Sequence, residues 1–158
     1  MKRLQRCHDI GDLRTVAQSR IPRAVFDFMD GAAEDEVSMQ GNRSSFAQYD
    51  LLPEVLTDVS NVNMTTTVMG QTIPFPLILA PTGLSRLFHH QGEKAVATAA
   101  ARAGLIYSLS SGSSVSIEEI GALTDGPKWF QIYVWKDRAL VSEFISRARA
   151  ANYQALCL

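Results

Sequence analysis

Three short apolar segments alternate with helical stretches in this chain, and this alternation most strongly constrains the fold. The apolar segments cover residues 76–80, 105–109 and 129–134. Strand-sized apolar segments separated by helices indicate βαβ units and a parallel sheet. Because both faces of a parallel sheet are covered, its chemistry gathers at the carboxyl ends of its strands. We therefore expect a ligand site where these segments end.

Polar residues stand at the expected strand ends. Pro81-Thr82-Gly83 and Ser110-Ser111-Gly112 follow the first two segments, and the third contains Gln131 and Tyr133. A buried amide such as Gln131 costs free energy unless it is hydrogen-bonded, which favours a functional role. Alternation along the strand puts Gln131, Tyr133 and, deeper, Trp129 on one face. The residues alone leave other roles open, since Thr82 and Ser110 can equally cap helices and Tyr133 can be a core residue.

Residues 1–60 predict a helical lead-in to the sheet. The expected helices run from Asp9 or Asp12 towards Ser19, over 23–29 between Pro22 and Gly31, and from the acidic run 34–36 towards Tyr49. Asp before a helix and Pro in its first turn favour these beginnings. Glu34, Asp35 and Glu36 can bind a metal or form a solvated first turn that matches the helix dipole. No His or Cys joins them, which favours the helix.

Residues 61–75 predict a β-hairpin, because Thr65–Met69 and Thr72-Ile73 are strand-like and flank a turn at Gly70-Gln71. Such a hairpin can close the amino-terminal end of a barrel. Residues 76–158 then alternate between strands and helices. The further expected elements are helices over 94–103, from Ser116, and from Asp137 to about 151, with a fourth strand over 154–158.

Composition and charge argue against several classes of protein. The chain is 46% apolar and 20% charged with a net charge of −1, which is ordinary for a globular domain and gives no basic stripe for nucleic acid. No segment resembles a signal peptide or a membrane span. Cys7 and Cys157 have no metal or redox spacing and favour a reducing, cytoplasmic setting. The adjacent His89 and His90 lack a carboxylate partner, which favours a loop role over metal ligation.

Five motifs, in order and spacing, resemble one family. They are residues 26–36, Asn42 with Phe46, 79–83 with Gly92-Glu93, 109–111 before 116–119, and 129–134. From about Ile10 onwards the chain is similar to the FMN-dependent α-hydroxy acid dehydrogenases and oxidases, which include glycolate oxidase, L-lactate dehydrogenase and mandelate dehydrogenase. The resemblance implies an α/β fold, the TIM (β/α)8 barrel. Such a barrel takes roughly 250 residues. We therefore expect residues 1–158 to form its amino-terminal half, about four βα units of a single domain in a longer protein.

The resemblance also implies FMN as the cofactor, lying across the carboxyl ends of the strands. The Pro81-Thr82-Gly83 loop would pass the reactive N5 edge of the flavin, where a residue without a Cβ lets the backbone approach closely. Ser110 and Gln131 would hydrogen-bond to the polar edge of the ring. Tyr133 would contact both flavin and substrate as a catalytic residue. The implied reaction oxidises a small 2-hydroxy acid, of the lactate, mandelate or glycolate type, to the 2-keto acid without a metal.

Departures from the family pattern qualify these roles. Phe28 stands where the family has a tyrosine whose hydroxyl holds the substrate carboxylate, so that contact is weaker or the substrate differs. Gly83 stands where many oxidases have alanine and mandelate-type enzymes have glycine, which favours a quinone or another electron acceptor over oxygen. The family's histidine base, its lysine near flavin N1 and its carboxylate-binding arginines match no residue of this sequence. We therefore expect this chain alone to be inactive.

Other interpretations of the same residues stay open. One is a non-catalytic half-barrel remnant or interaction module, which Phe28 favours. Another is a different FMN barrel, such as a type 2 isopentenyl diphosphate isomerase, although no phosphate-recognition pattern is visible. We expect the intact protein to be a homo-oligomer, either cytoplasmic or peripheral at the inner face of the membrane. The identity of the 2-hydroxy acid cannot be read from these residues.

Overall fold

The computed structural model describes residues 4–158, which divide into two compact units between Val59 and Ser60. The first unit corresponds in length to the helical lead-in expected over 1–60. That both units belong to one barrel domain stays a prediction.

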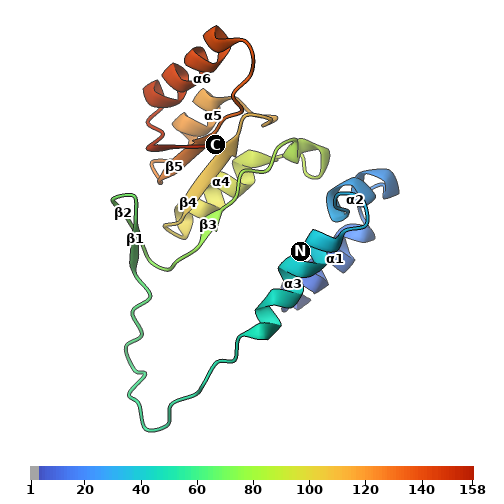
Figure 1. Ribbon diagram of the computed structural model, residues 1–158, viewed down its shortest axis with the longest axis vertical. Helices are drawn as coiled ribbons and strands as arrows, with labels where there is room; N and C mark the ends of the chain where they lie inside the picture. Colours follow the sequence, from blue (N-terminus) through green and yellow to red (C-terminus); the bar gives the residue numbers. More distant parts are fainter. Residues whose placement is uncertain (1–3) are drawn as a thin grey trace. The chain divides into compact units, whose positions relative to one another are not determined.

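Short helices make up the first unit (Figure 1). They are η1 (Leu4–Arg6), α1 (Ile10–Gln18), α2 (Arg23–Asp30), α3 (Val37–Ser44) and η2 (Ser45–Gln48). Asp9 caps α1 by accepting a hydrogen bond from the Asp12 N–H at 2.8 Å, and Gly31 follows α2, as the sequence predicts. The prediction that α3 begins at the acidic run is wrong. Glu34 and Glu36 have φ values of 50° and 58°, a left-handed backbone that an α-helix excludes.

An antiparallel hairpin opens the second unit. β1 (Thr66–Val68) pairs with β2 (Gln71–Ile73). Met69 and Gly70 form the turn between them, with φ values of 49° and 80°. Positive φ at both central residues is typical of two-residue hairpin turns, because their twist matches that of the strands. The hairpin therefore agrees with the prediction.

Four parallel strands form the sheet of the second unit. β3 (Ile78–Leu79), β4 (Ile106–Ser110), β5 (Lys128–Gln131) and β6 (Ala155–Cys157) lie side by side in the order of the sequence. The 3-10 turn η3 (Ser85–Leu87), α4 (Glu93–Arg102), α5 (Ile117–Leu123) and α6 (Arg138–Ala150) connect them (Figure 1). β3 is shorter than the predicted 76–80. Parallel neighbours joined in order by helices are successive βα units, as the sequence predicts.

The two faces of this sheet have different surroundings. Leu109 and Phe130 belong to a buried apolar cluster that includes residues of α4, α5 and α6. Because side chains alternate along a strand, Ser110 and Gln131 lie on the opposite face. Trp129 shares that face, and its Nε1–H donates to Oε1 of Gln71 in the hairpin at 3.2 Å. The hairpin thus contacts the side of β5 that the helices leave uncovered.

The end of β5 differs from the prediction. The predicted strand 129–134 stops at Gln131. The Ile132 N–H still donates to the Cys157 carbonyl at 3.0 Å, and the chain then leaves the sheet towards α6. Tyr133 therefore stands beyond the strand, and the expectation that strand alternation fixes its face is wrong.

Candidate functional site

Ser110 and Gln131 meet at the carboxyl ends of two neighbouring strands. They are register partners in β4 and β5. Gln131 Oε1 accepts hydrogen bonds from the Ser110 hydroxyl, the Ser111 hydroxyl and the Ser111 N–H, each at 3.2 Å. A backbone N–H can only donate, so the atom facing it must be the amide oxygen. The Gln131 Nε2 donates to none of the residues 4–158, and is therefore available to a ligand.

Two glycines bring the next loop against this pair. The Leu84 N–H donates to the Gly112 carbonyl at 3.0 Å, and the Gly112 N–H donates to Ser110 Oγ at 3.1 Å. A Cβ on Gly83 would stand 2.8 Å from the Gly112 oxygen, so only glycine allows this approach without movement. The β3–α4 and β4–α5 loops therefore lie against one another beside Gln131.

A buried carboxylate lies beneath the two loops. Glu93, at the start of α4, is fully buried. Its Oε1 accepts from the Ser85 N–H at 3.1 Å and the Ser114 N–H at 2.9 Å, and its Oε2 accepts from the Ser114 hydroxyl at 2.6 Å. Burial alone raises the pKa of this carboxyl, but the hydrogen bonds from Ser114 and Ser85 outweigh burial and lower the pKa overall. Glu93 is thus ionised at neutral pH.

The other predicted site residues are exposed. Pro81 and Thr82 are exposed in the loop that precedes Gly83. The Tyr133 side chain is 61% exposed, and its ring centroid lies 6.1 Å from that of Trp135. Phe28 belongs to α2 in the first unit and is 66% exposed. The structure thus brings together Gly83, Ser110 and Gln131 through their loops, and leaves the roles of Tyr133 and Phe28 as predictions.

The part of the chain that the structure describes contains no cluster of side chains suited to bind a metal ion. Among residues 4–158, no three His, Cys, Asp or Glu side chains gather so as to hold a metal ion. The ring centroids of His89 and His90 lie 4.3 Å apart, and the Gln91 N–H donates to His89 Nδ1 at 3.3 Å.

No helix within residues 4–158 combines the length and the apolar character needed to cross a membrane.

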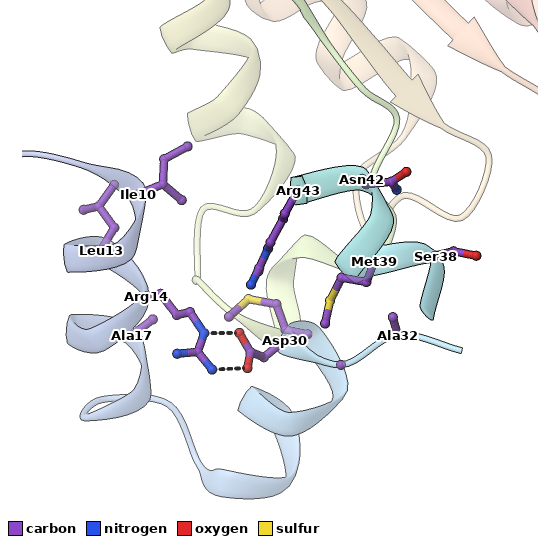
Figure 2. Close-up of a pocket in the computed structure, with 12 residues that line it drawn as sticks. Ile10, Leu13, Arg14, Ala17, Asp30, Ala32, Ser38, Met39, Asn42 and Arg43 are labelled. Atoms are coloured by element: carbon purple, nitrogen blue, oxygen red, sulfur yellow. Dashed lines mark hydrogen bonds and ion pairs between the residues drawn. The ribbon is translucent and has the colours of Figure 1, made fainter. Parts of the chain in front are cut away.

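A hollow in the first unit lies between α1, α2 and α3 (Figure 2). The Arg14 guanidinium donates to both carboxylate oxygens of Asp30, at 2.5 and 2.6 Å. The hydrogen bond from Arg14 lowers the pKa of Asp30, and the charge of Arg43 adds to that effect. We interpret this bidentate ion pair as the contact that holds α1 against α2.

In the sequence, Glu93 belongs to a motif that resembles the family and stands directly before the helix expected over 94–103. Its partners Ser85 and Ser114 lie 8 and 21 residues away. The one sequence signal is a carboxylate at a helix amino terminus next to Gly92, and this signal equally suits a solvated helix start. The fold is needed to show the burial.

Comparison with known proteins identifies the family. The profile of the FMN-dependent dehydrogenases matches residues 17–158. This chain belongs to the FMN-dependent dehydrogenase family. It is 39% identical over 150 residues to glycolate oxidase 1 of Zea mays, covering 95% of this chain and 41% of that protein. The chain thus spans about two fifths of the length of this relative.

Solved structures agree with this assignment. A soluble mutant of the membrane-associated (S)-mandelate dehydrogenase from Pseudomonas putida matches with a TM-score of 0.89 and 36% identity, covering 94% of this chain and 42% of that one. Mandelate oxidase bound to 3,3-difluoro-2-hydroxy-3-phenylpropionic acid matches with a TM-score of 0.87 and 36% identity, covering 92% of this chain and 44% of the other. These matches confirm the predicted fold, the amino-terminal part of a TIM (β/α)8 barrel.

FMN is the cofactor of the FMN-dependent dehydrogenases, and the strand ends of this member fit a flat polar ring. The Gly112 carbonyl fills the position that a Cβ on Gly83 would take, whereas a Cβ on Gly112 would meet only Ser110 Oγ, at 3.6 Å, so the backbone at Gly112 is open to a planar group. The Gln131 Nε2–H faces no partner among the described residues, and a flavin carbonyl or ring nitrogen can accept from it. These residues sit at the carboxyl edge of the strands, where TIM barrels bind their ligands.

Proposed function

We propose that the protein oxidises a small 2-hydroxy acid to the corresponding 2-keto acid with bound FMN. The observation that carries this proposal is the Ser110–Gln131 pair at the ends of β4 and β5, whose amide nitrogen stays available beside two glycines. FMN, when bound, accepts the two electrons that leave the substrate's α-carbon. Lactate, mandelate and glycolate represent the substrate class, because relatives named for glycolate, L-lactate and mandelate match more than nine tenths of this chain.

The chain's own residues would bind and orient the flavin ring. We assign Pro81, Thr82 and Gly83 to the side of the ring that carries N5, and Ser110 and Gln131 to its polar edge. The hydrogen bonds from Ser110 and Ser111 fix the Gln131 carboxamide, so its N–H groups are already oriented before a ligand arrives. A preoriented donor loses less conformational entropy on binding.

Tyr133 is proposed as the residue that contacts the substrate. Its phenol is largely exposed, and Trp135 packs beside its ring, so a hydroxyl on a supported side chain can reach a bound acid. Phe28 would contribute only apolar contact, since a phenyl ring makes no hydrogen bond to a carboxylate. We expect carboxylate binding to rely on other groups.

The electron acceptor is proposed to be a quinone or another carrier instead of oxygen. A Cβ at Gly83 would come within 2.8 Å of the Gly112 oxygen, so this loop conformation requires glycine, the residue typical of mandelate-type enzymes. A quinone acceptor is compatible with a cytoplasmic protein that binds peripherally at the inner face of a membrane. We also propose that the intact protein is a homo-oligomer.

The 158-residue chain tests the flavin site directly. We expect it to quench FMN fluorescence on titration, and to produce no keto acid from lactate, mandelate or glycolate with a quinone analogue, since no residue matches the family's histidine base. Gln131→Leu should weaken FMN binding about tenfold, by removing hydrogen bonds worth roughly 1.5 kcal/mol together. Steady turnover would contradict the proposed inactivity. Absence of FMN binding would contradict the flavin site and favour the non-catalytic alternative, an interaction module with the same half-barrel.

A further inference from the structure

One buried charge in the second unit has no part in the proposed reaction. Glu93 is fully buried, although its carboxylate is ionised. Burying a charge is costly unless hydrogen bonds replace its water. Here the two oxygens accept three hydrogen bonds, from the Ser85 N–H and from the N–H and hydroxyl of Ser114. The donors come from both loops that border the Ser110–Gln131 pair.

Glu93 connects to the candidate site through an unbroken set of contacts. Ser114 Oγ, which donates to Glu93, accepts the Arg86 N–H at 3.2 Å. Leu84, next to Ser85 whose N–H donates to Glu93, donates from its own N–H to the Gly112 carbonyl at 3.0 Å. Gly112 in turn donates to Ser110 Oγ, which donates to Gln131. Moving either loop therefore changes the positions of the groups at the ends of β4 and β5.

We propose that Glu93 is a positioning residue for the flavin ring, whose carboxylate holds the β3–α4 and β4–α5 loops where Gly83, Ser110 and Gln131 face one ligand. This inference rests on the proposed function. Leu84 supports it, because its φ of 54° is a left-handed conformation that a leucine adopts only when its surroundings impose it. The adjoining Ser85 N–H is one of the donors that Glu93 holds.

A carboxylate suits this task better than its amide. The Ser85 and Ser114 N–H groups can only donate, and charged acceptors form hydrogen bonds about twice as strong as neutral ones. In Glu93→Gln one oxygen becomes an NH₂ group that faces the Ser114 hydroxyl. That hydroxyl would have to turn and accept from the NH₂ group as well as from the Arg86 N–H, and its own proton would lose the acceptor that Glu93 Oε2 provides.

The test compares Glu93→Gln with Glu119→Gln in the 158-residue chain. Glu119 in α5 pairs with Lys94 of α4 on the surface, where Lys94 Nζ lies 2.7 Å from its Oε1, and Gln preserves its capping role. Amide hydrogen exchange by NMR and FMN binding by fluorescence quenching are measured for both. In Glu93→Gln we expect faster exchange at Leu84, Ser85 and Ser114, by about tenfold or more, with β4 amides unchanged. We also expect FMN binding about tenfold weaker and an altered absorption spectrum of bound flavin. Glu119→Gln should match the wild type.

Several outcomes would overturn the inference. They are unchanged FMN affinity and flavin spectrum in Glu93→Gln, or exchange that rises equally throughout β4, which would indicate general loosening. If the wild type binds no FMN, the proposed function fails, and the loop amides alone decide whether Glu93 holds the loops. If Glu93→Gln does not fold, Ser114→Ala replaces it. This variant loses the 2.6 Å hydroxyl contact but keeps the buried charge and both backbone donors. It should loosen the same loop amides, and unchanged exchange there would contradict the proposal.

Discussion

The two units of this chain bury their apolar side chains to very different extents. Phe26 is the one buried hydrophobic residue described before residue 60, and the others all lie within 60–158. In the first unit Ile10, Val37 and Phe46 are each more than 70% exposed. In the second unit the strands and the helices α4, α5 and α6 share a continuous buried cluster.

This difference shows that similar helices are stabilised in different ways. α1, α2 and α3 have 9, 8 and 8 residues, and isolated helices of that length are marginal in water. Their local support comes from the Asp9 cap and the Arg14–Asp30 pair. The helices of the second unit add the burial of a stripe of apolar residues, which is the larger contribution. We therefore expect the second unit to determine the cooperative unfolding of the chain.

The largest expected effect comes from the core of the second unit. Phe130 is 1% exposed and lies 6.1 Å, between ring centroids, from both Phe144 and Tyr153. Phe130→Ala should lower the free energy of unfolding by about 3–5 kcal/mol, through lost burial and the cavity left behind. Both tryptophans, Trp129 and Trp135, belong to this unit, so their fluorescence in a urea titration reports its unfolding.

Phe26→Ala is the matched control in the first unit. Phe26 is also buried, and Arg14 lies over its ring at 5.7 Å from the centroid. The substitution should leave the tryptophan transition within about 0.5 kcal/mol of the wild type, since Phe26 is not a member of the buried cluster of the second unit. An equal shift in both variants would break the distinction between the units.

A buried lysine should have the next largest effect. Lys128 is 3% exposed, and its Nζ donates to the Thr124 and Gly126 carbonyls at 2.5 and 2.9 Å. Lys128→Met should destabilise the second unit by about 1–3 kcal/mol, because both carbonyls lose a buried donor. Lys136→Met, at an exposed position, should change the urea midpoint little.

The pH dependence of the same variant checks the cause. Burial lowers the pKa of Lys128 below 10.5. Between the folded and unfolded pKa values the unfolded chain binds more protons, so wild-type stability should rise with pH across that interval. Lys128→Met should lack this rise, and a rise that persists in the variant would assign it to another group.

The features that the sequence predicts correctly in both units are those that depend on neighbouring residues. Helix starts followed from single residues, and Asp9, Ser116 and Asp137 each cap a helix as expected. Ser116 forms a full capping box with Glu119. Such contacts lie within one turn, so local sequence carries them. The βα order followed equally from apolar segments of strand length.

Features that depend on distant residues were predicted less well. The end of β5 is set by its pairing with β6, which the apolar run 129–134 does not reveal. Gln131 stands out in the sequence because an amide interrupts an apolar segment, whereas its hydrogen bonds to Ser110 and Ser111 depend on the register of β4 and β5. Glu93 shows the limit most clearly, because its burial is created by two loops that meet above it.

The smallest expected effect compares one ion pair in each unit. Arg147 donates to Glu118 at 2.7 and 3.0 Å, and the hydrogen bond from Arg147 lowers the pKa of Glu118 to about 2. The folded pKa lies below the unfolded value of 4.5, so the stabilisation is present above pH 4.5 and is lost as the pH falls through about 2. Its surface position limits the gain to less than about 1 kcal/mol.

Glu118→Gln should therefore lower the urea midpoint of the tryptophan transition slightly at pH 7 and less at pH 3. Arg14 lowers the pKa of Asp30 in the same way, yet Asp30→Asn should leave that transition unchanged at both pH values, because its pair joins helices of the first unit. Hydrogen exchange of the α1 and α2 amides should instead increase. If Asp30→Asn moves the tryptophan transition as far as Glu118→Gln does, the two units unfold together, and the stability of the lead-in helices is coupled to the barrel strands.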